Sequence, residues 1–387
     1  MDTPRSRIYL DHAATSFPKP PGVLEAMQRF VTELGTAPGR GTTRAGAEVQ
    51  QVIDRCRRQA ARLFAVPRPE QVIFTLNGTD SLNQAIHGLL HTGDRVVTTC
   101  WEHNSVLRPL WQLQQTQHVT VEVVPDDGTG LTDLQAFAQA LQQPARLVIL
   151  NHASNVTGLI QPVNEMIALA QKAGALVLLD AAQTAGHIPV SFHTLPVDLI
   201  ATPGHKGLHG PLGTGLLLLS DRAVQQMQPV RQGGTGTRSE SAEQPVELPE
   251  RFESGNLNAP GIFGLEAALA MLPAPSEESG ELALTRHFLS AVENLSGVQV
   301  PGGGADRPRV PVVSLSFERI TPHVMANLLD AHYGIETRAG LHCAPRAHAA
   351  LGTLEQGGTL RFSFGAGTTE QELDQALTAL AEILAAM

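Results

Sequence analysis

A series of short apolar runs, alternating with helical patterns, constrains the fold of this chain most strongly. Several runs, such as 147–150 and 176–179, are unbroken stretches of Val, Ile and Leu. Strands of this kind are typical of a parallel sheet whose two faces are both covered by helices. The expected strands are 71–75, 95–99, 119–124, 147–150, 176–179, 199–201 and 215–219. Helical patterns lie between them near 82–90, 132–142, 163–173 and 221–228. The series therefore predicts an α/β domain with a mainly parallel sheet.

Both flanks of this series carry further helical patterns. We expect helices at 22–34 and 47–64 before it, with Cys56 on the apolar side of the second. Residues 229–262 are rich in Gly, Ser, Glu and Pro, which predicts a long irregular excursion. Beyond it the expected elements are helices at 261–272, 280–295, 322–332 and 370–386 and strands at 310–317 and 360–364. The glycine-punctuated stretch 334–358 receives no assigned element.

The length of the chain indicates more than one domain. At 387 residues it is longer than a single hydrophobic core usually supports. The order of the elements predicts a large α/β domain over 18–260. A smaller α+β domain then combines 1–17 with 261–387.

Composition and charge exclude several classes of partner. A formal net charge of −10 argues against nucleic acid, and no apolar run approaches the roughly 20 residues that a membrane helix needs. Cys56, Cys100 and Cys343 are widely spaced and form neither a disulfide framework nor a zinc pattern, so we expect no metal. The N-terminus is polar and shows no signal-peptide pattern, so a cytoplasmic protein is expected.

Polar side chains cluster where the predicted strands end, the edge at which α/β sheets bind ligands. Residues 77–79, Asn-Gly-Thr, open a helix and can cradle a phosphate, although most such turns hold nothing. Asp180 ends a buried strand, where it either pairs with a cationic ring nitrogen or serves as a helix cap or ion-pair partner. His103 offers an imidazole for stacking and proton transfer, or is a surface histidine. Asn155 offers an amide to a phenolic oxygen, or belongs to a turn.

Lys206 lies in a stretch of unusual composition, 198–214, which contains four glycines and Pro211 after Pro203. Glycine and proline at this density impose a special backbone path. A lysine in a tight, partly desolvated loop has a lowered pKa and can form a Schiff base; a solvated lysine on a surface loop is the alternative. A phosphate cradle, a stacking imidazole, a carboxylate for a ring nitrogen and a Schiff-base lysine together indicate pyridoxal phosphate.

These residues belong to segments that occur in the order of a known family. The segments span nearly the whole chain and are 9–14, 102–105, 154–158, 180–183, 204–206, 251–255, 338–345 and 360–363. With them the chain resembles the class V aminotransferase family of fold-type I pyridoxal-phosphate enzymes, and within it the SufS-like (type II) cysteine desulfurases and selenocysteine lyases. The resemblance implies a large domain with a seven-stranded, mainly parallel sheet and a smaller α+β domain. It also implies a homodimer in which 233–257 reaches the cofactor of the neighbouring subunit.

The resemblance further implies a role for individual residues. Lys206 would form the Schiff base with pyridoxal phosphate, Asp180 would pair with the ring nitrogen, and His103 would stack on the ring. The other implied cofactor contacts are Asn155 and Gln183 near the ring oxygen and Gly78, Thr79, His205 and Asn256 at the phosphate. Arg361 would bind the substrate carboxylate in a bidentate pair, with Arg338 and Asn155 as further substrate contacts.

Cys343 separates the candidate functions. In the desulfurases that this chain resembles, the cysteine on this loop attacks the sulfur of cofactor-bound cysteine and leaves alanine and an enzyme persulfide. We therefore expect a cysteine desulfurase that acts on cysteine or a related amino acid and passes sulfur to an acceptor protein. The alternatives are a selenocysteine lyase, C–S lyase, epimerase or aminotransferase that does not use Cys343, and a non-catalytic relative. If Cys343 is not the nucleophile, we expect it to be a buried structural thiol.

The sequence departs from the family pattern at four places. Pro203 and Asn256 stand where hydroxyl side chains commonly contact phosphate, and 77–78 is Asn-Gly where Gly-Thr is usual. The region of Thr42 and Thr43 lacks a histidine that is common in the SufS-like group. These departures leave the preferred substrate open.

Overall fold

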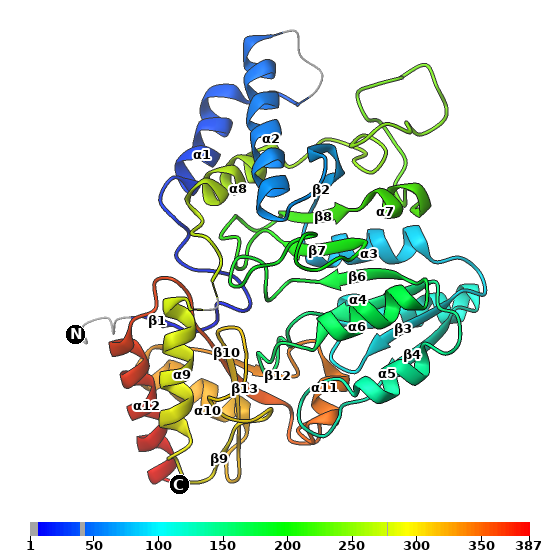
Figure 1. The fold of residues 1–387 in the computed structure, drawn as a ribbon. Coiled ribbons are helices and arrows are strands. Elements are labelled where there is room, and N and C mark those ends of the chain that lie inside the picture. The colour runs from blue at the N-terminus through cyan, green and yellow to red at the C-terminus, as the bar shows by residue number, and fades with distance from the viewer. Residues whose placement is uncertain (1–6, 39–42, 277) are drawn as a thin grey trace.

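The computed structural model describes residues 7–38, 43–276 and 278–387. Its large sheet has seven strands in the order β2-β8-β7-β6-β5-β3-β4 (Figure 1). The strands are β2 Val72–Thr75, β3 Arg95–Thr99, β4 Thr120–Val124, β5 Leu147–Asn151, β6 Leu176–Asp180, β7 Leu199–Pro203 and β8 Gly215–Leu219. Strand β8 is antiparallel to both its neighbours, and the other pairs are parallel. The expected seven-stranded, mainly parallel sheet is confirmed.

Helices cover both faces of this sheet. They are α2 Arg44–Leu63, α3 Gly78–Leu89, α4 Asn104–Gln117, α5 Leu134–Ala140, α6 Val163–Lys172, α7 Asp221–Gln226 and α8 Ala259–Met271. In β5, Leu147 and Ile149 pack in the core formed with α3, α4 and α7, whereas Val148 and Leu150 pack in the core formed with α2, α5, α6 and α8. Because both sets of alternate residues are buried, the strand needs no polar positions.

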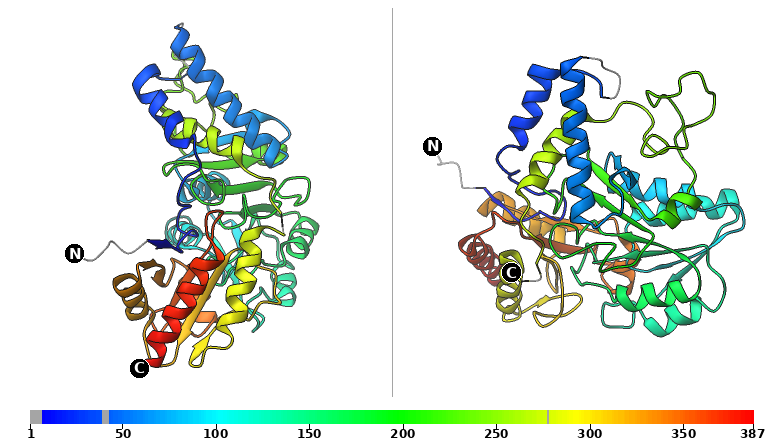
Figure 2. Two further views of the ribbon diagram at one scale, coloured as in Figure 1. Left: turned by 90° about the vertical axis from the view of Figure 1, so that its left-hand side faces the viewer. Right: turned by 45° about the horizontal axis from the view of Figure 1, so that its top comes forward.

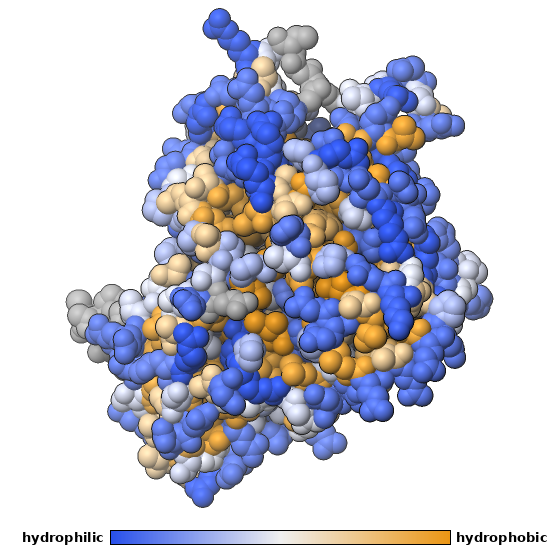
Figure 3. Space-filling view, in the orientation of Figure 1, coloured by the Kyte–Doolittle hydropathy of each residue, from blue (hydrophilic) through white to orange (hydrophobic). Residues whose placement is uncertain are grey.

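Three helices project beyond one edge of the large sheet (Figure 2). Helix α1, Val23–Arg29, continues as a π-helical turn over Phe30–Leu34 and packs with α2 and α8. Phe30 meets Phe263 of α8 edge-on, with ring centroids 5.2 Å apart. In the view of Figure 3 the outer surface of this projection is mostly hydrophilic, while apolar residues gather towards the middle of the molecule.

A second, antiparallel sheet forms the core of the lower part of the molecule in Figure 1. Its strands are β12 Arg338–Gly340, β13 Thr359–Ser363, β10 Val312–Phe317 and β9 Val298–Gln299, in that order. The helices around it are α9 Gly280–Val292, α10 Pro322–Leu328 with a π-helical turn at Leu329–Tyr333, α11 Pro345–Ala350 and α12 Glu370–Ala385. Strand β1, Ile8–Tyr9, pairs in parallel with β11, Ile335–Glu336. The N-terminal strand thus joins the C-terminal α+β unit as expected, and the residue boundaries of the two domains stay a prediction.

Several elements differ from the sequence expectations. Helix α4 was not expected, since Pro109 interrupts its pattern and Trp111 on it is 64% exposed. Strands β11 and β12 and helix α11 lie in 334–358, where each is too short to produce a periodic signal. Strand β7 extends through Pro203, two residues beyond the expected strand 199–201.

Within the described residues, no helix is long and apolar enough to cross a membrane.

A buried ion pair holds the excursion 229–258 against the large sheet. Arg57 on α2 donates from both terminal nitrogens to the two carboxylate oxygens of Glu253, each at 2.9 Å. Glu253 also accepts the backbone N–H of Phe74 in β2 at 2.7 Å. The side chains of Arg57 and Glu253 are only 8% and 5% exposed, so the pair is shielded from water.

Glu253→Ala should lower the free energy of unfolding by about 3–5 kcal/mol, because it leaves the buried Arg57 guanidinium unpaired. Urea denaturation followed by circular dichroism measures the loss. The matched control is Glu247→Ala, which removes an ion pair with Arg238 in the same excursion whose side chains are 50% and 54% exposed. The control should cost at most about 1 kcal/mol, and equal losses in the two variants would contradict this account.

Candidate active site

A cavity lies at the edge of the large sheet where β2, β3, β5, β6 and β7 end. Its lining residues are Asn77, Gly78, Thr79, Leu82, His103, Ser105, Asn151, Asn155, Asp180, Ala182, Gln183, Pro203, His205 and Lys206. These five strands run in one direction, so their carboxyl ends meet at one edge. The structure thus brings together the strand-end residues that the sequence singled out separately.

Lys206 follows β7 in a loop packed closely enough that glycines are required beside it. A Cβ at Gly204 would collide with the Thr214 hydroxyl, and one at Gly207 with the Ala185 carbonyl. Burial lowers the pKa of the Lys206 amine to about 8, and the positive charge of Arg361 acts in the same direction. The nearby carboxylates of Asp180 and Asp11 act on this pKa in the opposite direction but do not outweigh burial. At this pKa roughly a tenth of the Lys206 amine is the neutral nucleophile at pH 7, and the neutral fraction rises as the pH approaches 8.

Two acidic side chains lie at neighbouring strand ends. Asp180, at the end of β6, is 3% exposed and accepts the backbone N–H of Ala182 at 2.9 Å. Glu102, after β3, is fully buried and accepts from the Thr99 hydroxyl and the Asn151 backbone N–H, both at 2.9 Å. Burial, followed by the nearby charge of Asp180, raises the pKa of Glu102 to about 8. Of the two, Asp180 lines the cavity, where it can face a cationic group of a ligand.

His103 caps α4 and is oriented by Ser105. Its Nδ1 accepts the backbone N–H of Ser105 at 3.0 Å, so the proton of the neutral ring lies on Nε2. Burial lowers the pKa of His103 to about 4, with Lys206 and Arg361 adding to the shift. The Ser105 hydroxyl lies 2.7 Å from that of Thr79. His103 therefore presents an uncharged imidazole to the cavity.

The first turn of α3 supplies anion-binding groups to the same cavity. The N–H groups of Gly78 and Thr79 are at the helix N-terminus, where no carbonyl of the helix can accept them. A Cβ at position 78 would come within 3.2 Å of the Pro203 ring, so a glycine at this position lets the start of α3 lie close to Pro203. Opposite them, His205 has a buried Nδ1 without a partner among the residues described. These donors suit a phosphate even though Pro203 offers neither a hydroxyl nor an N–H.

The N-terminal segment is hydrogen-bonded to two residues of the cavity lining, Gln183 and His205. The amide of Gln183 donates to the Ala13 carbonyl at 3.2 Å. The His205 carbonyl accepts the backbone N–H of Ser16 at 3.0 Å and the Lys19 ammonium at 2.9 Å. Residues 13–19, far from the cavity in sequence, therefore hold the loop that carries Lys206.

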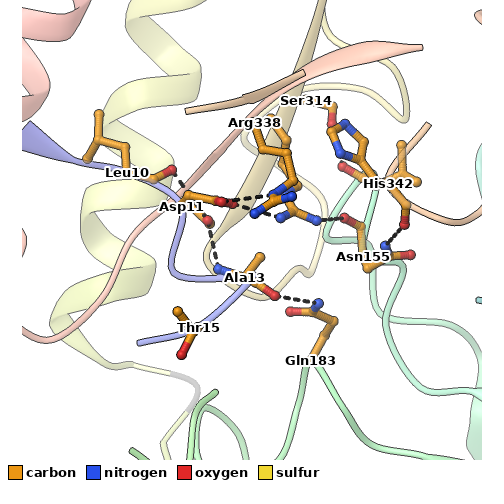
Figure 4. A network of polar contacts seen from close by, with 12 residues as sticks. Leu10, Asp11, Ala13, Thr15, Asn155, Gln183, Ser314, Arg338 and His342 are labelled. Atoms are coloured by element: carbon orange, nitrogen blue, oxygen red, sulfur yellow. Dashed lines mark hydrogen bonds and ion pairs between the residues drawn. The ribbon is translucent and has the colours of Figure 1, made fainter. Parts of the chain in front are cut away.

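Arg361 and Arg338 share the carboxylate of Asp11. Figure 4 shows Arg338 and Asp11 close to Asn155 of the cavity wall. Arg361 donates to Asp11 Oδ1 and Arg338 to Asp11 Oδ2, each at 2.8 Å. A second terminal nitrogen of Arg361 donates to the Asn155 carbonyl at 3.2 Å. The buried Arg361 guanidinium is thus linked to the cavity wall through Asn155.

Cys343 lies on an exposed turn tied to the cavity wall. Both His342 and Cys343 have left-handed backbone angles, φ 48° and 57°, which non-glycine residues adopt at a cost. The Asn155 amide donates to the His342 carbonyl at 2.6 Å, and the backbone N–H of Asn104 donates to the Cys343 carbonyl at 2.7 Å. Cys343 is exposed, so the alternative that it is a buried structural thiol is wrong.

The other two cysteines are packed in the interior. Cys56 is fully buried in the core with α2, as expected. Cys100 is 8% exposed, and burial raises the pKa of its thiol to about 12. Neither offers a thiolate at neutral pH.

Asn256 and the region of Thr42 and Thr43, two of the places where the sequence departs from the family pattern, are not part of the Lys206 cavity as described. Asn256 does not line the Lys206 cavity; it borders two separate depressions with Glu253 and Leu257. Its contact with the partner's cofactor stays a prediction. Thr42, in the region of the missing histidine, lies outside the described residues, and the neighbouring Thr43 caps α2 by accepting the Gly46 N–H at 3.1 Å.

The sequence reasoning missed three residues of this site: Asp11, Glu102 and Ser105. Each stands inside a segment that had been matched to the family, 9–14 or 102–105. Their positions in those segments were the available signal. What they contact depends on tertiary pairing, because Asp11 is 350 residues from Arg361.

A nucleophilic lysine, a buried carboxylate and an anion-binding helix start at one sheet edge define an enzyme site for a small anionic ligand. The family described as aminotransferase class V matches this chain over residues 8–376. The chain belongs to that family, so the resemblance inferred from the sequence is confirmed.

Individual relatives agree over nearly the whole chain. A probable cysteine desulfurase of Methanothermobacter thermautotrophicus is 32% identical over 98% of this chain and 95% of its own. A cysteine desulfurase of Yersinia pestis is 31% identical over 87% and 84%. Among solved structures, the apo cysteine desulfurase from Thermococcus onnurineus NA1 superposes with a TM-score of 0.89 at 30% identity, over 98% and 95% of the two chains. The cysteine desulfurase CsdA from Escherichia coli gives 0.87 at 29%, with the same coverage.

Arg361→Gln should raise the pH at which Lys206 becomes reactive. Because the guanidinium charge disfavours the ammonium form of Lys206, its removal raises the lysine pKa above about 8. The rate of acylation of Lys206 in the cofactor-free protein, followed by peptide mass spectrometry against pH, reports the midpoint. An unchanged midpoint would refute the electrostatic coupling. Arg346→Gln, which changes an exposed arginine within α11, serves as the control.

Proposed function

We propose that this protein is a pyridoxal-phosphate-dependent cysteine desulfurase that converts L-cysteine to L-alanine and keeps the sulfur on Cys343 as a persulfide. One observation carries the proposal: the exposed Cys343 turn is bonded to Asn155, which also lines the Lys206 cavity. The relatives named cysteine desulfurase, at about the same length as this chain, support it.

The residues present fit the proposed cofactor. Its phosphate would meet the N–H groups at the start of α3, the Thr79 hydroxyl and the unpartnered Nδ1 of His205. Asp180 would pair with the pyridine nitrogen, and His103 would stack on the ring. Asn155 Oδ1, which has no partner among the residues described, and the Gln183 side chain would contact the ring edge. When bound, pyridoxal phosphate supplies an electron sink for charge at the α-carbon of the amino acid.

The protein's own groups account for the remaining chemistry. Arg361 binds and orients the substrate carboxylate, and the neutral Lys206 amine accepts the α-proton of the substrate. The Cys343 sulfur attacks the substrate sulfur, so one C–S bond breaks and one S–S bond forms. Cysteine and the Cys343 thiol thereby give alanine and a Cys343 persulfide, which needs no outside oxidant or reductant.

A homodimer would complete the site. Asn256 and the excursion 233–257 lie away from the Lys206 cavity of their own subunit. They are mostly exposed, so the excursion is free to reach a neighbouring copy. The persulfide on the exposed Cys343 would pass to a sulfur-acceptor protein. We place the protein in the cytoplasm, since its three cysteines are free thiols.

Cys343→Ser should reduce alanine formation from cysteine at least ~100-fold, because the hydroxyl is a far weaker nucleophile towards sulfur than a thiolate. The visible absorbance of the bound cofactor should not change. Alanine and sulfide are assayed together, and Cys100→Ala serves as the matched control that keeps turnover. Full activity in Cys343→Ser would instead favour a lyase or aminotransferase that needs no thiol, and a parallel assay with selenocysteine tests the selenocysteine lyase alternative.

A further inference from the structure

Two arginines stand directly opposite each other beside the candidate site. Arg338 in β12 and Arg361 in β13 are cross-strand partners in an antiparallel pair. Like charges in this position repel each other, and Arg361 is only 3% exposed, so water screens it little. A carboxylate between them is therefore required, and Asp11 supplies it with one oxygen on each guanidinium. The three side chains together keep one positive charge.

The donors of Arg361 are not all used. Its Nε is buried and has no partner among the residues described, while Nη2 on the same edge holds Asp11. Nε and Nη2 form the edge at which a guanidinium binds a carboxylate through two parallel hydrogen bonds. A substrate carboxylate on this edge would take Nη2 from Asp11 and satisfy Nε for the first time.

The backbone beside Asp11 is held in place, so only its side chain is free to reorient. The Ser363 N–H donates to the Leu10 carbonyl at 2.8 Å, and the Ala13 N–H donates to the Ser363 hydroxyl at 2.8 Å. Figure 4 shows Ala13 bonded on its other side to Gln183. Asp11 therefore stays within reach of Arg338 when it leaves Arg361.

We propose that Asp11 is an internal counter-ion that competes with the substrate carboxylate for Arg361. When an amino acid binds, Arg361 exchanges Asp11 for the substrate, and Asp11 remains on Arg338. Each arginine then has one carboxylate, and the residual positive charge of the empty site is neutralised. Asp11 is thus a positioning residue that holds Arg361 until a carboxylate ligand replaces it. This inference rests on the proposed function, which makes an amino acid carboxylate the ligand of Arg361.

The test uses the holoenzyme and two probes without an amino group. 3-Mercaptopropionate carries the carboxylate, and 3-mercaptopropionamide has the same shape without the charge. In Asp11→Asn, which removes the competitor, the dissociation constant of 3-mercaptopropionate measured by calorimetry should fall about tenfold, as expected for one hydrogen bond between charged groups. Binding of the amide should not change. The KM for cysteine should fall together with the dissociation constant of 3-mercaptopropionate. In Asp11→Glu, which keeps a carboxylate at this position, both constants should equal those of the wild type.

Thermal unfolding gives a second measurement. Asp11→Asn should melt at a lower temperature than the wild type, because the two arginines repel, and 3-mercaptopropionate should raise its melting temperature more than that of the wild type. Glu336→Gln, which removes an exposed partner of Arg7 in the adjacent β11, is the control without effect on either probe.

An unchanged or weaker affinity of Asp11→Asn for 3-mercaptopropionate would overturn the counter-ion role and assign Asp11 a purely structural one. The two proposals fail separately. A wild-type protein that makes no alanine from cysteine, but whose Asp11→Asn variant binds the carboxylate more tightly, would contradict the desulfurase function and support the counter-ion.

Discussion

The burial of charged groups at the ends of covered strands governs the whole site. Both faces of the large sheet are packed, so a charge at a strand end has little water and needs a partner. Asp180 has one backbone donor, and the amine of Lys206 loses charge by lowering its pKa to about 8. The Asp180 carboxylate can still accept a hydrogen bond from a cationic group of a ligand, and the Lys206 amine can still react with a carbonyl group. The site is therefore lined by polar groups that a ligand can satisfy.

The same constraint explains why the N-terminus returns to the site. Strand β1 pairs with β11 in the C-terminal unit, which delivers Asp11 to Arg361 and Arg338. From there the segment continues to the carbonyl of His205, where Ser16 and Lys19 donate. One short segment thus connects the arginines of the smaller sheet with the lysine loop of the larger one.

The sequence predicted much of the fold because a strand that is buried on both faces is an unbroken run of apolar residues. The seven apolar runs are the seven strands of the large sheet, and no strand end differs from the prediction by more than two residues. Helix α4 was not predicted, because Pro109 interrupts its periodic pattern and Trp111 is exposed. Strands β11 and β12 escaped because strands of two and three residues carry no periodicity. Among the site residues, several next to a strand end, such as Asp180 and His103, were recognisable. Asp11 was not, because its partners lie more than 300 residues away in the sequence.

By itself, the sequence determined the class of fold, the edge at which a ligand binds and the residue types available there, because strand burial and strand-end chemistry are local properties. Only the tertiary structure decided which of these residues meet. It paired Arg338 with Arg361 across two strands, placed Asp11 between them, and bonded the turn of Cys343 to Asn155. Such contacts depend on how distant segments pack, since the free energy of a pair of charges depends on distance and on exposure to water, neither of which is written in the order of residues.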